Sequence, residues 1–352
     1  MKTYLRRFDI TRETVRDAYD LWRRSQAGRL NSWRVAKEHG SADALIEEVY
    51  GEIKGRSLSC PPVRFRDIID PNSGKERRIG VESIKQQLVD YVAVSCLQPL
   101  IDARTGYWQV ASVKGKGGAY VATALRKWTR GRGWFAHLDI RKCYPSIKPE
   151  VVHGILAKRV ASDDVMYVCD YLLSTYEDGL SIGSYFSLRM CQLVLSEGYH
   201  HVEGLRAEHH GVERAAVAHQ VWYMDDVVLF ARTKRDLRRA CESLRAFMAG
   251  LGLTVKPYKV CRLGREHCGL AGWRALSGRL SVRRRIHRRA RRAMLRMRRP
   301  CLRRARRAAA YWGWLKRCGR RARSRYGQAL AAAGAWVSRH ERSMHELSGA
   351  GV

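Results

Sequence analysis

Residues Val221–Phe230 read VWYMDDVVLF, and two adjacent carboxylates, Asp225 and Asp226, interrupt a run that is otherwise typical of a buried strand. Placing two ionised carboxylates in an apolar setting is unfavourable unless a cation compensates their charge. The flanking residues predict a β-hairpin over 219–231 with both carboxylates at its tip. The hairpin is therefore either an ordinary acidic surface turn or a site that binds something positive.

A third carboxylate, Asp139, ends another short apolar strand in the segment HLDIRKCYPSI. If this strand and the hairpin are neighbours in one sheet, Asp139 converges with Asp225 and Asp226, and three ionised carboxylates together need cations. Two Mg²⁺ ions with oxygen ligands, for which Mn²⁺ can substitute, would satisfy them and catalyse in-line phosphoryl transfer. One ion would activate the attacking 3′ oxygen, and the other would stabilise the leaving pyrophosphate.

The charge balance indicates the class of partner. The 352 residues contain 67 Lys and Arg against 33 Asp and Glu, a formal net charge of +34. Residues 281–325 alone hold 20 Lys and Arg and no acidic residue. Such an excess predicts a polyanionic partner, for which nucleic acid is the natural candidate, although an unusually Arg-rich solvated surface is the alternative.

Other features of the sequence bear on the cellular location and on metal binding by the cysteines. The sequence has no run of about 20 apolar residues and no signal-peptide core at its start, so we expect a cytoplasmic protein without a membrane partner. The ten cysteines include no C-x-x-C pair. Cys261, His267 and Cys268 are close enough in sequence for a zinc site, but ordinary reduced cysteines explain them as well.

Sequence patterns predict the helices and strands of residues 1–135. Residues 1–58 predict a helical N-terminal extension in which Thr11 caps a helix. Residues 59–135 predict a hairpin around Pro71–Gly74, an amphipathic helix over 81–101, and a Gly/Lys loop before a basic helix.

The remaining residues divide into two regions. Residues 136–278 alternate strand, helix, hairpin, helix and strand signals, which predicts an α+β fold with a small split βαβ sheet and helices on one face. The expected elements are a strand ending at Asp139, helices over 148–176, 188–202 and 233–252, and strands over 253–260 and 268–276. Residues 279–352 are Arg-rich. Their segment 283–307 predicts a helix or helix pair with one apolar seam, formed by Ile286, Ala290, Met294, Leu295 and Leu302.

Seven short segments, in this order between about residues 60 and 320, resemble motifs of reverse transcriptases. They are KERRI (75–79), LDIRKCYPSI (138–147), GLSIGSYFS (179–187), YMDD (223–226), GLTVKPYK (252–259), GLAGWR (269–274) and YWGWLKR (311–317). The resemblance implies a right-hand polymerase that makes cDNA from an RNA template. Residues 59–135 would be its fingers, 136–278 a ferredoxin-like palm with an antiparallel sheet, and 279–352 an Arg-rich helical thumb and tail.

The resemblance assigns the catalytic residues. Asp139, Asp225 and Asp226 would bind the metal ions, with the backbone carbonyl of Ile140 as a further ligand. Lys259 would donate a proton to pyrophosphate, and its alternative is a solvated lysine at a strand start.

A second set of residues would bind the incoming nucleotide. Lys75 and Arg77 would bind its phosphates, with Arg78 as the alternative to Arg77 and an exposed hairpin charge as the competing explanation. Ile182 and Gly183 would lie against the base pair, where a missing Cβ lets the backbone approach closely.

Tyr144 bears on the choice between DNA and RNA synthesis. It lies five residues after Asp139, where the family keeps an aromatic ring under the sugar, and such a ring leaves no room for a ribose 2′-hydroxyl. RNA-copying RNA polymerases carry a smaller or polar residue there, together with a Gly-Asp-Asp hairpin. The resemblance therefore implies that the product is DNA, unless Tyr144 only packs in the core.

The resemblance also indicates nucleic-acid contacts. Template-backbone lysines, a primer-grip turn, thumb arginines along a duplex and two tryptophans that either stack on nucleic acid or fill the thumb core are candidates. These residues are Lys114, Lys116, Gly272, Trp273, Arg283, Arg284, Arg288, Arg291, Trp312 and Trp314.

The compact size, the Ile-Gly-Ser at 182–184 and the Arg-rich end look most like stand-alone bacterial enzymes of diversity-generating retroelements or antiphage defence. Those enzymes usually carry Gln where this chain has Leu188, a departure for which Arg189 is a candidate substitute. We find no RNase H or DNA endonuclease pattern. The expected partners are a dedicated structured non-coding RNA as template, a DNA or RNA primer, dNTPs, and an accessory protein or a second copy of the chain.

Two rival functions stay open at this point. One is a polymerase of the same fold that extends DNA without a template or primes from its own side chain. The other is a catalytically retired RNA-binding scaffold, which would predict a replaced metal carboxylate.

Overall fold

The structure, a computed structural model, describes residues 4–6, 8–70, 74, 76–176, 179–297, 301–318 and 331–340. The chain folds into two compact units. The first unit consists of Met1–Tyr107, Ile140–Glu203 and Ser243–Lys256, and the second consists of Trp108–Asp139, Gly204–Glu242 and Pro257–Val352. None of the described helices is long and apolar enough to cross a membrane.

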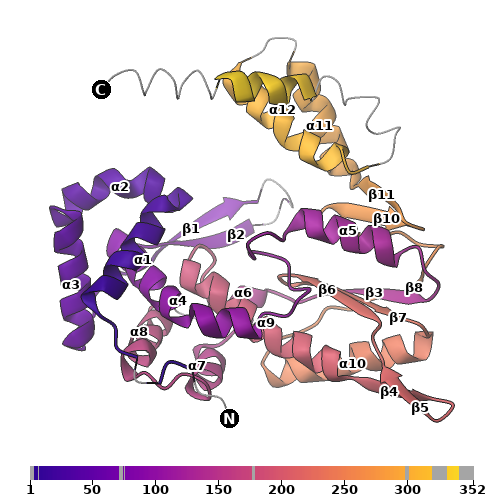
Figure 1. The fold of residues 1–352 in the computed structure, drawn as a ribbon, viewed down its shortest axis with the longest axis horizontal. Coiled ribbons are helices and arrows are strands. Elements are labelled where there is room, and N and C mark those ends of the chain that lie inside the picture. Colours follow the sequence, from indigo (N-terminus) through magenta and orange to yellow (C-terminus); the bar gives the residue numbers. More distant parts are fainter. Residues whose placement is uncertain are drawn as a thin grey trace. The chain divides into compact units, whose positions relative to one another are not determined.

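The first unit is mainly helical and carries one β-hairpin (Figure 1). Its elements are α1 (Arg12–Arg24), α2 (Gln26–His39), α3 (Ala42–Lys54), β1 (Arg64–Ile69), β2 (Glu76–Val81), α4 (Ile84–Arg104), α6 (Cys143–Ser146), α7 (Pro149–Ala157), α8 (Asp163–Ser174) and α9 (Tyr185–Gly204). The predicted cap is confirmed, because the Thr11 side chain accepts a hydrogen bond from the backbone N–H of Thr14. The predicted hairpin is also confirmed, with β1 antiparallel to β2.

Helix α4 is the centre of the first unit. α1 packs against it, and the Trp22 indole N–H donates to Gln87 Oε1 over 3.0 Å. The sequence predicts an amphipathic helix here, and the structure shows a buried surface that is wider than a single helix face. Successive residues such as Leu88–Asp90 and Val92–Val94 are all buried, and three successive residues cannot share one helix face. α4 therefore buries most of its surface against its neighbours and leaves one partly exposed stripe, which is formed by Gln87, Tyr91, Ser95 and Gln98.

A buried polar network fixes the segment between α8 and α9. Ser184 Oγ donates to Asp90 Oδ2 over 2.7 Å, and the Phe186 N–H donates to the same oxygen over 3.0 Å. The Tyr176 hydroxyl lies 2.8 Å from Ser184 Oγ and 3.4 Å from Glu82 Oε1. The network thus ties the 181–187 segment to α4 and to the end of β2.

The second unit is built on β-sheets (Figure 1). Its elements are α5 (Gly118–Trp128), β3 (Trp134–Asp139), β4 (Arg206–His209), β5 (Val212–Ala215), β6 (His219–Tyr223), β7 (Asp226–Ala231), α10 (Lys234–Gly250, which continues into the first unit), β8 (Val260–Arg262), β9 (Cys268–Leu270), β10 (Trp273–Leu276), β11 (Arg279–Val282), α11 (Arg284–Arg296) and α12 (Leu302–Leu315). Residues 331–340 are also helical.

The main sheet of the second unit is antiparallel, in the order β6-β7-β3-β8. Val121 and Leu125 of α5 pack against Val221, Val228 and Phe230 of this sheet in one core. The hairpin over β6 and β7 and the strand ending at Asp139 are both confirmed. The expected strand over 253–260 is wrong apart from its last residue and a single bridge at Val255, and Pro257 offers no N–H to a ladder.

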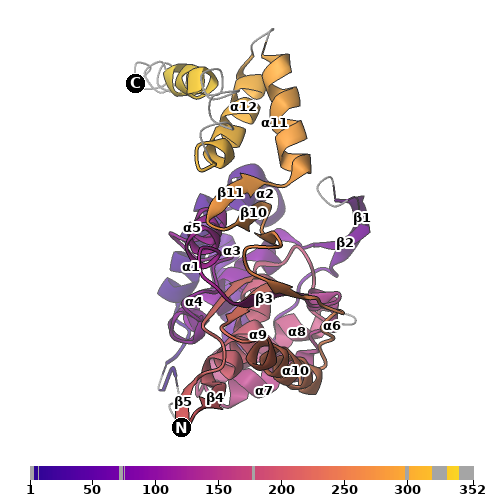
Figure 2. The ribbon, with the colours of Figure 1, turned by 90° about the vertical axis from the view of Figure 1, so that its right-hand side faces the viewer.

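The Arg-rich region forms a helix pair, as one of the two sequence alternatives stated. α11 directly follows β11, and α11 and α12 lie side by side (Figure 2). The seam differs from the predicted one, because Leu295 is 50% exposed while Ala293 is buried beside Ala290. Ala308 of α12 lies in the same core cluster, which also buries Leu315 and has Met294, Tyr311 and Trp312 packed against it.

The network at Asp90 generates a prediction about stability. Burial, together with the nearby Asp90 carboxylate, raises the pKa of Glu82 to about 9. Asp90 accepts hydrogen bonds that favour its ionised form, so the proton resides on Glu82. Between pH 4.5 and about 9 the folded state therefore still holds a proton that the unfolded chain has already released. The free energy of unfolding should fall as pH rises through this window, by on the order of a few kcal/mol.

We expect Glu82→Gln to flatten this dependence, because the amide mimics the neutral acid. Urea denaturation measured at several pH values checks it. The matched control is Glu13→Gln on the exposed face of α1, which should leave the wild-type slope intact. Equal pH slopes in wild type and Glu82→Gln would contradict the assignment.

Candidate active site

The register of the main sheet places the predicted metal-binding carboxylates at one end of two neighbouring strands. β3 and β7 are antiparallel, and the Cα partner of Asp139 is Asp226. Asp225 directly precedes Asp226 in the turn, and all three residues are half-buried. The sequence hypothesis that the two strands are neighbours in one sheet is therefore confirmed.

A strained turn presents Asp225. Tyr223 pairs with Asp226, so Met224 and Asp225 form a two-residue hairpin loop. Met224 has φ +54°, a conformation that long side chains rarely adopt. Two-residue hairpins favour a positive φ at the first loop position, because the resulting twist matches that of the strands. The backbone at this tip is thus held in a strained form, which is typical of functional sites.

His137 is a site residue that the sequence analysis missed. It lies two positions before Asp139 on the same strand face, and its Nε2 is 3.3 Å from Asp226 Oδ1. The available signal was the i, i+2 spacing of His and Asp in AHLD, which puts both side chains on the carboxylate face of the sheet.

The carboxylate oxygens of Asp139, Asp225 and Asp226 are chemically suited to a hard divalent cation, because Mg²⁺ prefers such oxygen ligands. Among the described residues, no group of three or more His, Cys, Asp or Glu side chains is arranged to hold a metal ion. Asp226 instead has His137 as a neighbour. Ile140, the predicted carbonyl ligand, is buried, and it forms a bridge with Val255 within the first unit.

Lys259 is fully exposed in the second unit. Its Nζ lies 3.0 Å from Glu266 Oε2, and this hydrogen bond raises the pKa of Lys259. The lysine therefore keeps its proton, as a donor must before it gives the proton up.

The predicted nucleotide-binding residues lie in the first unit. Arg77 is exposed on β2, with its guanidinium 3.5 Å from Asp70 Oδ2. Arg78 lies over the Phe65 ring at 4.1 Å and lines a cavity of about 130 Å³ together with Ile182. The structure thus brings Arg78 and Ile182 together, whereas Lys75 lies outside the described residues.

Gly183 is required by a close backbone approach. The Gly80 N–H donates to the Ile182 carbonyl over 2.8 Å, which docks this segment on β2. Gly183 has φ +120°, and a Cβ there would lie 2.4 Å from the Gly80 carbonyl oxygen. The neighbour that excludes a side chain in this structure is therefore β2. Tyr144 is half-buried in α6, and its carbonyl accepts a hydrogen bond from the Leu180 N–H over 3.1 Å.

The predicted primer-grip residues form a packed turn in the second unit. Gly272 has φ +87°, and a Cβ there would lie 2.6 Å from Ile286 Cδ1. Trp273 is 2% exposed, and its ring centroid is 4.7 Å from that of Trp314. Trp312 packs against the α11–α12 core. The indoles at 273 and 314 therefore pack against each other, which for Trp314 agrees with the second of its two sequence alternatives, filling the core.

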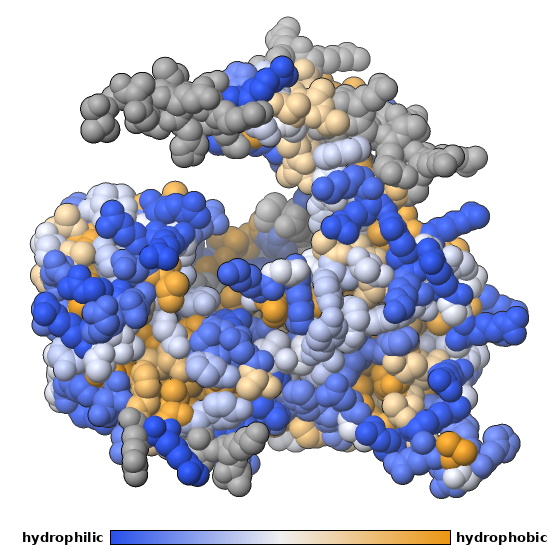
Figure 3. Space-filling view, viewed as in Figure 1, coloured by the Kyte–Doolittle hydropathy of each residue, from blue (hydrophilic) through white to orange (hydrophobic). Residues whose placement is uncertain are grey.

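The predicted cationic contacts are mostly accessible. Lys114 is exposed, while Lys116 is half-buried with its Nζ 5.8 Å from the Tyr120 ring centroid. The exposed arginines of the thumb prediction are Arg283, Arg284, Arg288 and Arg291. On the face of the second unit that Figure 3 shows, hydrophilic residues predominate around α5 and the β10–β11 hairpin. A surface of this kind suits the backbone of a nucleic acid.

Two further residues that the sequence analysis named have partners within the chain. The buried Arg189 guanidinium donates to Gln192 Oε1 over 2.7 Å and to Gln98 Oε1 over 3.2 Å, so it joins α9 to α4. The Cys261 thiol lies 3.3 Å from Glu266 Oε2, and within the part of the chain that the structure describes no three His, Cys, Asp or Glu side chains are grouped to hold a metal ion.

Comparisons with solved structures show the fold. The chain is similar to the BmCPV RNA-dependent RNA polymerase in its quiescent state, with a TM-score of 0.51 and 10% identity, covering 78% of this chain and 25% of that one. A second RNA-dependent RNA polymerase, described as vp4 with dsRNA, gives a TM-score of 0.50 and 9% identity, covering 77% and 25%. Apo telomerase from Candida tropicalis, truncated from its C-terminal domain, gives 0.47 and 12%, covering 64% and 56%.

The chain spans about a quarter of the length of the RNA polymerases that it matches. At such identities the likeness shows the fold alone, and it confirms the expected α+β architecture of right-hand polymerases. No curated protein sequence matches this chain.

The family model described as reverse transcriptase (RNA-dependent DNA polymerase) matches residues 68–274. This match covers more than half of the chain, and it contains the facing carboxylates Asp139 and Asp226 and the strained turn between β6 and β7. The chain belongs to the reverse transcriptase family.

Proposed function

We propose that this chain is an RNA-directed DNA polymerase that copies an RNA template into cDNA by two-metal phosphoryl transfer. The observation that carries the proposal is the register of β3 and β7, which sets Asp139 opposite Asp226 with Asp225 beside it. Membership of the reverse transcriptase family supports the chemistry. Fingers, palm and thumb would occupy residues 59–135, 136–278 and 279–352.

Each residue has a defined task in this proposal. Asp139, Asp225 and Asp226 would hold two Mg²⁺ ions, which supply activation of the 3′ oxygen and charge compensation of the pyrophosphate. Lys259 would hold a proton at Nζ for the departing pyrophosphate. Arg77 and Arg78, with Lys75, would bind the triphosphate.

We further propose that the template is a dedicated structured RNA and that the enzyme serves a diversity-generating or antiphage system. The support is compositional, because the charge of +34 exceeds what a single hybrid duplex requires. A DNA or RNA primer and an accessory protein or second copy complete the proposed set of partners. Binding of random RNA as tightly as of a neighbouring transcript would contradict the dedicated template.

The carboxylates generate the central prediction. We expect Asp225→Asn/Asp226→Asn to lower dNTP incorporation on a primed RNA template by at least about a hundredfold, because the amides cannot compensate divalent cations. Single-nucleotide primer extension measures this, and Asp17→Asn on the exposed face of α1 is the control. Failure of the wild type to incorporate any dNTP would favour an RNA-binding scaffold. Products that ignore the template sequence would favour a template-independent enzyme.

Tyr144 generates a prediction about the sugar. Replacing Tyr144 with Ala removes the ring proposed to exclude the 2′-hydroxyl, so the preference for dNTP over rNTP should fall by about tenfold or more. The ratio of kcat/KM for the two nucleotides reports the effect. Tyr107→Ala removes an exposed ring of the same unit and should leave the ratio unchanged. An unaltered ratio in Tyr144→Ala would show that this tyrosine only packs.

A further inference from the structure

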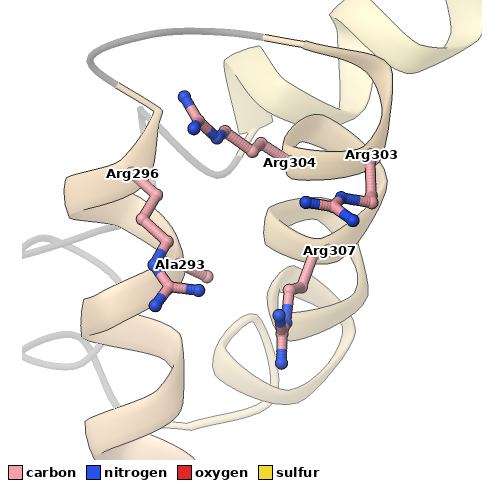
Figure 4. A pocket seen from close by; sticks show the side chains of 5 residues that line it. All are labelled: Ala293, Arg296, Arg303, Arg304 and Arg307. Carbon is pink, nitrogen blue, oxygen red and sulfur yellow. The ribbon is translucent and has the colours of Figure 1, made fainter.

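Two cavities of the described structure differ in their lining. The larger, of about 380 Å³, is lined mainly by arginine side chains of α11 and α12 (Figure 4), so it is part of the cationic surface already described. The smaller, of about 130 Å³, lies in the first unit beside the β1–β2 hairpin. Phe65 and Arg78 line it from the hairpin, and Tyr176, Ser181 and Ile182 line it from the chain between α8 and α9.

Ser184, which follows these lining residues, uses all of its hydrogen-bonding capacity. Its Oγ donates to Asp90 Oδ2 over 2.7 Å, accepts from the Tyr176 hydroxyl over 2.8 Å and accepts from the Ser187 N–H over 3.0 Å. A hydroxyl has one proton and two lone pairs, so these three bonds fix its position. Because Ser184 is 4% exposed, solvent offers no ready replacement for a lost partner.

Helix capping alone does not account for these bonds. Ser184 directly precedes α9, and the bond from the Ser187 N–H is the one that an N-cap serine accepts. Capping does not use the hydroxyl proton or the second lone pair. Here the proton goes to the fully buried Asp90 carboxylate, and the lone pair accepts from Tyr176, which lines the cavity. Ser184 thus joins the start of α9 to α4 and to the chain that follows α8.

Asp90 makes the bond from Ser184 a strong one. Burial raises the pKa of Asp90 to about 6, against hydrogen bonds from the Phe186 N–H and from Ser184 that lower it, so the carboxylate is ionised at neutral pH. Hydrogen bonds to an ionised acceptor are about twice as strong as those between neutral groups. The position of Ser184 is therefore set by α4.

The residues just before Ser184 are held against β2. The Ile182 carbonyl accepts from the Gly80 N–H over 2.8 Å, and Gly183 lies too close to the Gly80 carbonyl to admit a Cβ. The Ser181 N–H donates to Ser187 Oγ over 3.1 Å. Because consecutive Cα atoms stay about 3.8 Å apart, a displaced Ser184 would carry Gly183 and Ile182 with it.

We propose that Ser184, held by Asp90 and Tyr176, is a positioning residue that sets Ile182 and Gly183 for contact with the incoming nucleotide. This inference rests on the proposed function, which places the nucleotide against these two residues. The Ser184 hydroxyl does not itself contact the nucleotide, because its three internal bonds occupy it. Ser184 therefore contributes to nucleotide affinity and not to the chemistry at the carboxylates.

The test separates nucleotide affinity from catalysis. We expect Ser184→Ala to raise KM for the incoming dNTP by about tenfold while kcat changes by less than about threefold, because the loss affects binding. The matched control is Ser162→Ala, which removes a serine of similar burial that caps α8 through the Val165 N–H and should leave KM unchanged. Single-nucleotide primer extension on a primed RNA template gives both constants.

A second pair of variants removes only the hydroxyl of a tyrosine. Tyr176→Phe keeps the ring that lines the cavity but loses the bond to Ser184, so KM should rise by about threefold or more. The control, Tyr171→Phe, removes a hydroxyl of α8 that accepts from the Cys60 N–H over 2.6 Å, and KM should stay at the wild-type value. Thermal unfolding verifies that each variant is folded, and Tyr176→Phe decides the question should Ser184→Ala fail to fold.

A binding measurement makes the inference independent of turnover. A primer that ends in a dideoxynucleotide cannot be extended, so the Kd for the next dNTP is measured at equilibrium, by fluorescence anisotropy of a labelled dNTP. This Kd should rise by about tenfold in Ser184→Ala and stay at the wild-type value in Ser162→Ala.

The outcomes distinguish this inference from the polymerase proposal. Unchanged KM and Kd in Ser184→Ala, equal changes in Ser184→Ala and Ser162→Ala, or a loss confined to kcat would overturn the inference and leave the polymerase proposal intact. A wild type that binds dNTP with the expected dependence on Ser184 but incorporates none would overturn only the polymerase proposal. A wild type that binds no dNTP would overturn both.

Discussion

The pairing of β3 with β7 is the constraint on which the rest of the site depends. Side chains alternate along a strand, so a shift of one residue would move Asp139 to the opposite face of the sheet. The apolar partners along the two strands, such as Phe135 with Phe230 and Leu138 with Val227, hold this register in the core. Packing energy that has nothing to do with chemistry thus sets where the carboxylates lie.

In the first unit, buried contacts likewise fix the position of residues 181–187, which the proposed function places at the incoming nucleotide. The 181–187 segment has backbone contact with β2 through Ile182 and side-chain contact with α4 through Ser184. Asp90 accepts from this segment while Glu82 stays neutral, so the two acids lie close together without two charges. Hydrogen bonds are directional, so such a buried polar network fixes one arrangement more sharply than apolar contacts do.

Local sequence patterns predicted much of the fold. The hairpin at 219–231, the strand ending at Asp139 and the helix pair after residue 283 follow from periodicity and turn residues. The remaining features depend on tertiary contacts, which a local sequence pattern does not contain. In α4 the polar residues Gln86 and Asp90 are buried, so its sequence pattern does not reveal how wide its buried surface is. A tryptophan has the same sequence signal whether it stacks on a base or, like Trp273, fills a core. Glu82, Asp90 and His137 have no local motif at all, because their partners are brought together only by the fold.

The alanine seam between α11 and α12 has a thermodynamic consequence. Small residues such as Ala290 and Ala308 bury little apolar area, so their contact opposes the mutual repulsion of the surrounding guanidinium groups only weakly. A polyanion that occupies this region would screen the repulsion and stabilise the helix pair through linkage. Ligand and fold would then be coupled, and the melting temperature of this region would report on occupancy. In this respect a bound polyanion would act as a missing part of the structure, supplying the negative charge that residues 267–340 lack.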